Sequence, residues 1–245
     1  MYKDHKKWEP PSEEATLWRY MDFTKFMDLI MNKSIYFNRI DKFNDPYEGH
    51  ATTGIINFAK QVGNPYYIME LQENQRLLDG LRKFTFVNCW HVNSYESAAM
   101  WSLYLKTDEG IAIKTKFNRM REAFKGTEVI TGGMVKYVDF EKHDDWFINL
   151  TDYFILKRIS FEHEKEFRLF WVIDDVPDSD TLSEVKEGPF EFGINIDVDI
   201  EILIEEIYIS PTAHAWFENL VRNIVKELIN PEIPVIKSKL YQLPK

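Results

Sequence analysis

Short stretches in which apolar and polar residues alternate run through much of this chain, and such alternation predicts β-strands. The predicted strands are Thr16–Met21, Ser34–Asn38, Lys83–Trp90, Gly110–Lys116, Val129–Val138 with a break at Gly132–Gly133, and Phe190–Ile196. Elsewhere apolar residues recur three and four positions apart, which predicts helices. The predicted helices are Phe23–Met31 with Asp22 as N-cap, Tyr67–Lys83, Ser97–Leu105, Arg119–Phe124, Trp146–Leu156, and a long C-terminal helix from Ser210–Pro211 to Asn230–Pro231.

Helical and strand patterns mix freely along the chain, and no internal repeat separates them. This mixture predicts one α+β domain over residues 15–245, with a mostly antiparallel mixed sheet, flanking helices and the long C-terminal helix. Residues 1–14 are charged and contain Pro10–Pro11, so we expect them to form a loose lead-in.

The stretch Lys157–Phe170, which reads KRISFEHEKEFRLF, combines many charged residues with apolar residues spaced between them. Alternation in its second half predicts a strand, in which side chains two positions apart share a face. Glu164, Glu166 and Arg168 would then share one face, while Phe167 and Leu169 would face the core. Two interpretations stay open: the polar face lines a cleft, or it is an exposed sheet edge with cross-strand ion pairs.

The composition favours a folded protein of the cytoplasm. Hydrophobic residues make up 44% of the 245 positions, which supplies a packed core and argues against disorder. We expect neither a membrane span nor a secretory signal, and the single cysteine, Cys89, excludes an internal disulfide. The net charge of −10 argues against duplex nucleic acid as the main partner. The acidic segment Val172–Glu206 is a solvated face or a surface for a basic or regulatory partner, such as an antitoxin.

Several common catalytic motifs are missing from the sequence. It has neither a Walker A motif nor G-x-G-x-x-G, and its six histidines form no i, i+4 pair, so no metal cofactor is expected. A metal-dependent nuclease needs an acid-x-Lys strand, but His163 stands where the acid should be. Cys89 and His91 would share one face of a strand, which leaves open a nucleophile pair beside the commoner buried cysteine.

A set of motifs follows one another in a fixed order from Trp18 to Asn230. The most specific are FNDPYEG (43–49), WSLY (101–104), GIAIK (110–114), and the pair Lys157–Arg158 followed by EKEFR (164–168). With these motifs the chain resembles a large bacterial family, domain of unknown function twenty-nine seventy-one. That resemblance implies little established function.

The order of elements is also similar to that of the ADP-ribosyltransferase superfamily: a strand with Arg or His, a helix, a strand, a strand followed by a short aromatic helix, and a late strand with E-x-E. Those enzymes hold NAD in a cleft of a split sheet and use a glutamate of the late strand. The resemblance implies NAD as substrate, Glu166 as catalytic carboxylate, Glu164 as its partner, and Arg19 as the NAD anchor. The implied binding residues are Tyr20, Trp101, Ser102, Tyr104, Asn44, Asp45 and Arg168.

The implied activity is transfer of ADP-ribose from NAD to a macromolecule, or hydrolysis of NAD, with toxin or phage-defence effector as a role. The sequence departs from the superfamily where Phe86–Asn88 replaces an expected Ser-x-Ser or Ser-x-Thr motif. A non-enzymatic module that binds a nucleotide or a protein is the alternative, and a nuclease comes third. The enzyme hypothesis requires Arg19, Tyr104 and Glu166 to converge on one cleft, and it fails if Glu166 is sealed against Arg158 or Arg168.

Each candidate residue also has a purely structural explanation. Trp101 and Tyr104 fit a buried helix face, and Asn44 and Asp45 fit a turn. Arg19 fits an ion pair with Glu48 or Glu166.

Overall fold

The computed structural model describes residues 1–105, 107–144 and 149–243. Its strands are β1 (Thr16–Asp22), β2 (Ser34–Arg39), β3 (Thr85–Val92), β4 (Gly110–Lys116), β5 (Thr131–Met134), β6 (Lys136–Val138), β7 (Leu156–Arg158), β8 (Glu166–Val172), β9 (Gly193–Asp197), β10 (Glu206–Ile209) and β11 (Val235–Lys237). Its α-helices are α1 (Phe23–Asn32), α2 (Thr53–Val62), α3 (Pro65–Leu81), α4 (Ala98–Tyr104), α5 (Phe117–Glu122), α6 (Ser179–Leu182), α7 (Ile200–Leu203) and α8 (Ala215–Leu228). Short 3₁₀ helices are η1 (Ile40–Lys42), η2 (Leu150–Ile155) and η3 (Ile159–Glu164).

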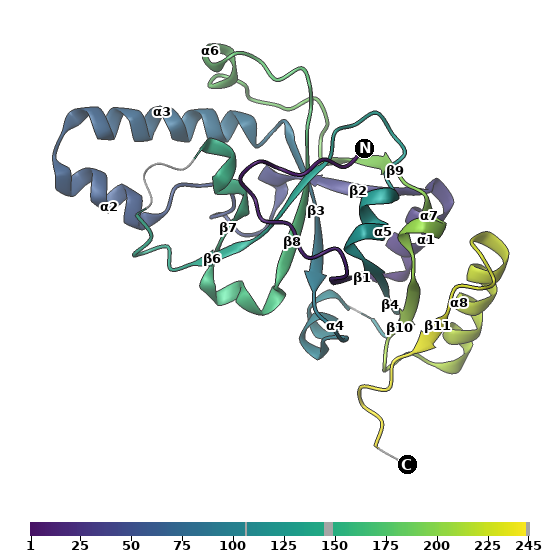
Figure 1. The fold of residues 1–245 in the computed structure, drawn as a ribbon. Helices are drawn as coiled ribbons and strands as arrows, with labels where there is room; N and C mark the ends of the chain where they lie inside the picture. The colour runs from purple at the N-terminus through teal and green to yellow at the C-terminus, as the bar shows by residue number, and fades with distance from the viewer. Residues whose placement is uncertain (106, 145–148, 244–245) are drawn as a thin grey trace.

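One large sheet organises these elements. Its strand order is β11-β10-β4-β1-β3-β2-β9, with β8 paired to both β3 and β5. Its strand pairs are antiparallel except that of β10 and β11, which is parallel. Figure 1 shows α2 and α3 as a hairpin that projects from one side, with α8 at the opposite end. The prediction of an α+β fold with a mostly antiparallel mixed sheet is confirmed.

The sheet splits between β1 and β2. β8 pairs with β3 along residues 85–91 and so occupies one whole edge of that strand. β1 and β2 must share the other edge, where β1 pairs with His91 and Val92 and β2 pairs with Phe86 and Val87. Within the described chain, residues 88–90 of β3 therefore have no strand partner on that edge, and a gap opens there.

Alternation in β8 places its side chains on two faces, as the pattern predicts. Phe167 and Leu169 are fully buried in the larger core cluster, and Glu166 and Arg168 bond to each other on the opposite face. Glu164 was expected on the same strand, and that prediction is wrong. It is the last residue of η3. Lys165, with a left-handed φ of 41°, turns the chain before β8 begins.

Helix α1 has the predicted start, whereas α8 does not. The Asp22 side chain accepts a hydrogen bond from the backbone N–H of Lys25, which confirms it as the N-cap of α1. Helix α8 begins at Ala215, after Pro211 rather than around it. The Ser210 hydroxyl accepts from the backbone N–H of Thr212, so the Ser-Pro pair shapes a turn that precedes the helix.

Residues 1–14 are packed against the domain, so the expectation of a loose lead-in is wrong. Trp8 is buried, contacts the Phe170 ring, and donates from Nε1 to Asp152 Oδ1 at 2.8 Å. A Cβ at Gly133 would lie 2.6 Å from Trp8 Cβ, so glycine at this position permits the close approach. The large apolar area of one tryptophan therefore anchors a segment that is otherwise charged.

Two further predicted elements have different boundaries. Of the predicted helix Trp146–Leu156, residues 146–148 lie outside the described chain and residues 150–155 form η2. The predicted strand Val129–Val138 consists of β5 and β6, and Gly132–Gly133 lies inside β5 rather than at the break. None of the described helices is long and apolar enough to cross a bilayer.

Candidate functional site

A cavity of about 540 Å³ lies where the sheet splits, and its lining residues come from β1, α1, β2, η1 with the turn after it, β3, α4 and the junction of η3 with β8. This volume is within the range of roughly 300–1,000 Å³ for small-molecule sites. Side chains replace the missing strand bonds in the gap. Arg19 Nη1 donates to the carbonyl of Cys89 at 3.0 Å, and Asn88 Nδ2 donates to the carbonyl of Tyr36 at 2.8 Å.

The split brings together a majority of the residues predicted for the site. Those that line the cavity are Arg19, Tyr20, Asn44, Tyr104, Glu164 and Glu166. Arg19, Tyr104 and Glu166 therefore meet the first requirement of the enzyme hypothesis, convergence on one cleft.

Arg19 is a cation without a counter-ion among the described residues. No carboxylate of the described residues forms an ion pair with it, so the alternatives of a pair with Glu48 or Glu166 are wrong. Its guanidinium lies 5.9 Å from the centre of the Trp90 ring, and burial lowers the pKa of Arg19. Since an arginine stays protonated even so, the cavity wall holds a positive charge that is available to an anionic ligand.

Arg168 lies behind the cavity and holds two carboxylates. It donates from Nε and Nη2 to Glu166 at 2.7 and 3.1 Å, and from Nη1 and Nη2 to Glu48 at 2.7 and 2.9 Å. Its fifth N–H is used by a bond of 2.8 Å to the carbonyl of Phe154. A guanidinium has five N–H donors, so this fully buried side chain has none left for a ligand. Its predicted role in binding substrate is therefore not supported by its geometry.

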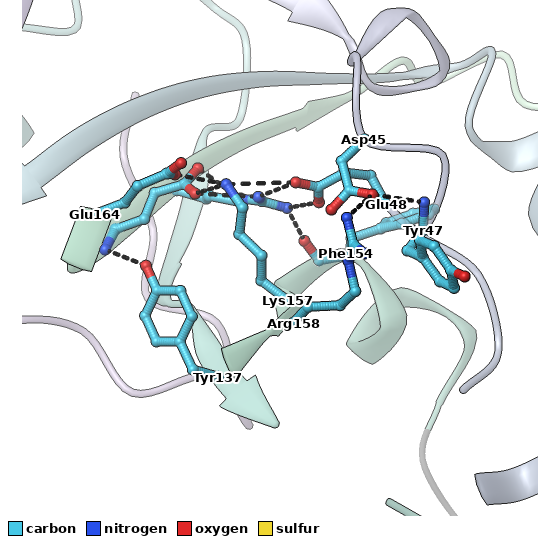
Figure 2. Close-up of polar contacts among 10 residues, drawn as sticks. Asp45, Tyr47, Glu48, Tyr137, Phe154, Lys157, Arg158 and Glu164 are labelled. Atoms are coloured by element: carbon cyan, nitrogen blue, oxygen red, sulfur yellow. Dashed lines mark hydrogen bonds and ion pairs between the residues drawn. The ribbon is translucent and has the colours of Figure 1, made fainter. Parts of the chain in front are cut away.

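Lys157 joins three carboxylates. Its Nζ lies 2.5 Å from Glu164 Oε2, 3.1 Å from Glu166 Oε2 and 3.5 Å from Glu48 Oε1. Figure 2 shows this ammonium group between Glu164 and Glu48, and below it the Tyr137 hydroxyl, which accepts from the backbone N–H of Glu166 at 2.8 Å. Burial alone would lower the pKa of Lys157, but the charges of Glu166, Glu48 and Glu164 raise it, so the group stays protonated.

The two glutamates of the E-x-E motif have different surroundings. Burial alone would raise the pKa of Glu166, but Arg168 and Lys157 lower it to about 2, and both carboxylate oxygens accept bonds from these cations. Glu164 accepts from Lys157 through Oε2 alone, so within the described residues its Oε1 has no donor. Glu166 is thus sealed against Arg168, so the enzyme hypothesis fails in the form that takes Glu166 as the catalytic carboxylate. Among the described residues, Glu164 is the glutamate of this motif with an oxygen that accepts no bond.

Tyr104 lies between the cationic and acidic parts of the cavity. Burial of its hydroxyl end, and then the charges of Cys89, Glu164 and Glu166, raise its pKa. Tyr20 is more constrained, because its hydroxyl accepts from the backbone N–H of Ser97 at 2.8 Å.

Besides Arg168, three predicted binding residues lie outside the cavity. Trp101 is buried and donates from Nε1 to Glu96 Oε2 at 2.9 Å, as a core residue of α4 would. Ser102 points to solvent on the exposed side of the same helix. Asp45 accepts from Arg158 Nη2 at 3.0 Å (Figure 2). Its neighbours Phe43 and Asn44 line the cavity in its place.

The sequence pattern predicts no role in the site for Glu48 or Lys157, and none as a ligand group for His91. Glu48 lies in the FNDPYEG motif and Lys157 in the Lys-Arg pair, so the motifs of the family resemblance already contain both residues. Cys89 and His91 both line the cavity, but burial raises the pKa of the Cys89 thiol and so opposes a nucleophilic thiolate.

Comparisons of the chain with protein-family models, with curated proteins and with solved structures found no match. Among the described residues, no group of three His, Cys, Asp or Glu side chains is placed to hold a metal ion. What the cavity binds is therefore inferred from its own side chains.

Proposed function

We propose that the cavity binds NAD and that the protein is an ADP-ribosyltransferase-like enzyme of the cytoplasm, which transfers ADP-ribose to a macromolecule or to water. The observation that supports this most is the meeting of Arg19, Tyr104 and the two glutamates in the gap between β1 and β2. Arg19 suits the pyrophosphate, because a guanidinium without a counter-ion can donate to two phosphate oxygens.

The acidic part of the cavity suits the reacting end of NAD. Cleavage of the bond between nicotinamide and ribose develops positive charge on the sugar, which a fixed carboxylate stabilises. We assign this role to Glu164, because no described residue donates to its Oε1, whereas Glu166 is held by Arg168 and Lys157. Glu166 then acts as a positioning residue that fixes Lys157, and Lys157 in turn orients Glu164.

Nicotinamide release by the purified protein tests this proposal. Wild type is compared with Glu164→Gln and Glu166→Gln, and with Glu162→Gln as a control that makes the same change at an exposed position of η3. We expect Glu164→Gln to lower the rate at least a hundredfold in a protein that circular dichroism shows to be folded, while Glu162→Gln retains the wild-type rate. A Glu164→Gln variant as active as wild type would refute the assignment.

A nucleotide-binding module without turnover is the second candidate, and the saturated carboxylate of Glu166 favours it. Both oxygens of Glu166, the glutamate that the resemblance implies as catalytic, already accept bonds from cations, so Glu164 would have to stabilise a transition state without it. Calorimetry with NAD separates the two candidates. Binding that depends on Arg19 without nicotinamide release would support the module over the enzyme.

A further inference from the structure

Three residues that line the cavity carry buried polar atoms with no partner among the described residues. These atoms are Ser34 Oγ, Trp90 Nε1 and His91 Nε2. Their residues are 2%, 1% and 3% exposed. A buried polar atom left without a hydrogen bond costs roughly 1–3 kcal/mol, so such atoms around one cavity indicate a ligand that completes their bonds.

His91 is the most closely defined of the three. Its Nδ1 lies 2.6 Å from the backbone carbonyl of Glu164, and since a carbonyl only accepts, Nδ1 carries the proton. Burial lowers the pKa of His91, and the nearby Lys165 and His163 add to this, although the bond to Glu164 opposes it. In the resulting neutral imidazole, Nε2 is an acceptor with a fixed direction.

The same backbone bond places a second acceptor nearby. Glu164 contributes its carbonyl to His91 and its free Oε1 to the cavity. Two acceptors repel a phosphate but suit hydroxyl groups, which can donate to both. The donors that suit a phosphate are Arg19 on β1 and the indole N–H of Trp90, whose side chain leaves β3 on the face opposite to that of His91.

We propose that His91 Nε2 accepts a hydrogen bond from a ribose hydroxyl of the bound nucleotide, with Glu164 Oε1 as the acceptor for a neighbouring hydroxyl. The inference rests on the proposed function in so far as it takes the cavity to hold a nucleotide. It adds a residue that selects ribose over deoxyribose, because a site built to bond a hydroxyl discriminates against a ligand that lacks it.

Two substitutions separate this acceptor from the structural bond of the same ring. His91→Asn keeps an N–H that can reach the Glu164 carbonyl but removes the atom at the Nε2 position. His91→Gln places an amide oxygen close to that position. Urea unfolding and circular dichroism of both variants establish that they are folded before binding is compared.

The experiment is calorimetric titration with D-ribose 5-phosphate, its 2-deoxy and 3-deoxy forms, and NAD. We expect wild type to prefer ribose 5-phosphate over at least one deoxy sugar by roughly tenfold, His91→Asn to lose this preference, and His91→Gln to retain part of it. If neither variant is folded, the ¹⁵N chemical shift of His91 Nε2 is measured in wild type instead. We expect this shift to change when ribose 5-phosphate is added, but not when the disfavoured deoxy sugar is added.

The outcomes distinguish this inference from the proposed function. Binding of ribose 5-phosphate with the expected preference, but none of NAD, would leave the inference standing and refute NAD as substrate. If NAD binds but wild type and His91→Asn show the same sugar preference, the proposed function stands and the inference is refuted. Water would then bond to Nε2. Absence of binding by every probe would overturn both.

Discussion

Replacement of Arg168 by methionine tests whether the buried ion network holds the fold together. The change removes five hydrogen bonds and leaves Glu48 and Glu166 with Lys157 as their remaining cation. Loss of one partner from a buried ion pair typically costs about 3–5 kcal/mol, because a charge stays buried without compensation. We expect a loss of that size in the free energy of unfolding at pH 7.

Urea unfolding followed by tryptophan fluorescence measures this loss. With a slope of about 3 kcal/mol per molar urea, the expected loss lowers the midpoint by roughly 1–1.7 M. Arg222→Met is the matched control, since Arg222 forms an exposed pair with Glu218 four residues away on α8. Such pairs contribute about 0.3–0.5 kcal/mol, so its midpoint should move little.

The difference in the free energy of unfolding between wild type and Arg168→Met should depend on pH, which gives an independent check. In wild type the pKa of Glu166 is lowered to about 2 from 4.5, so its contribution to stability is complete above pH 4.5 and is lost as the pH falls toward 2. In Arg168→Met, burial has less opposition and the Glu166 carboxylate takes up its proton at higher pH. The two proteins should therefore differ less at pH 4 than at pH 7. A loss below 1 kcal/mol at pH 7, or a difference that does not shrink on acidification, would refute the reasoning.

Two further substitutions test the cavity and the N-terminal segment. Arg19→Met removes a cation that pairs with no carboxylate of the described residues. We therefore expect an unfolding free energy equal to or above that of wild type, and an affinity for NAD at least tenfold lower. A loss of stability above 2 kcal/mol would show that the bond from Arg19 to the Cys89 carbonyl is structural. Trp8→Ala should lower the free energy of unfolding in urea by about 3–5 kcal/mol. Trp216→Ala, on an exposed face of α8, should change it by no more than about 0.5 kcal/mol. Equal effects would mean that residues 1–14 are not part of the cooperative fold.

Several features of the fold could be read from the sequence because they depend on neighbours in the chain. Alternation along β8 places Phe167 and Leu169 in the core and Glu166 and Arg168 on the other face, since successive side chains of a strand point in opposite directions. Asp22 is the N-cap of α1 because its side chain reaches an N–H three residues away. The mixture of such elements was enough to predict the fold class.

The site depended on contacts that no local pattern records. Arg168 holds Glu48, 120 positions away, and this long-range bond seals Glu166 while Glu164 stays open to the cavity. The cavity itself exists because β8 occupies one whole edge of β3, which leaves β1 and β2 to share the other. Local sterics and capping act over a few residues, whereas strand pairing and buried ion pairs are chosen by which distant segments pack together. The sequence therefore determined the elements and their faces, and the tertiary structure decided which charges are paired and which remain free to bind.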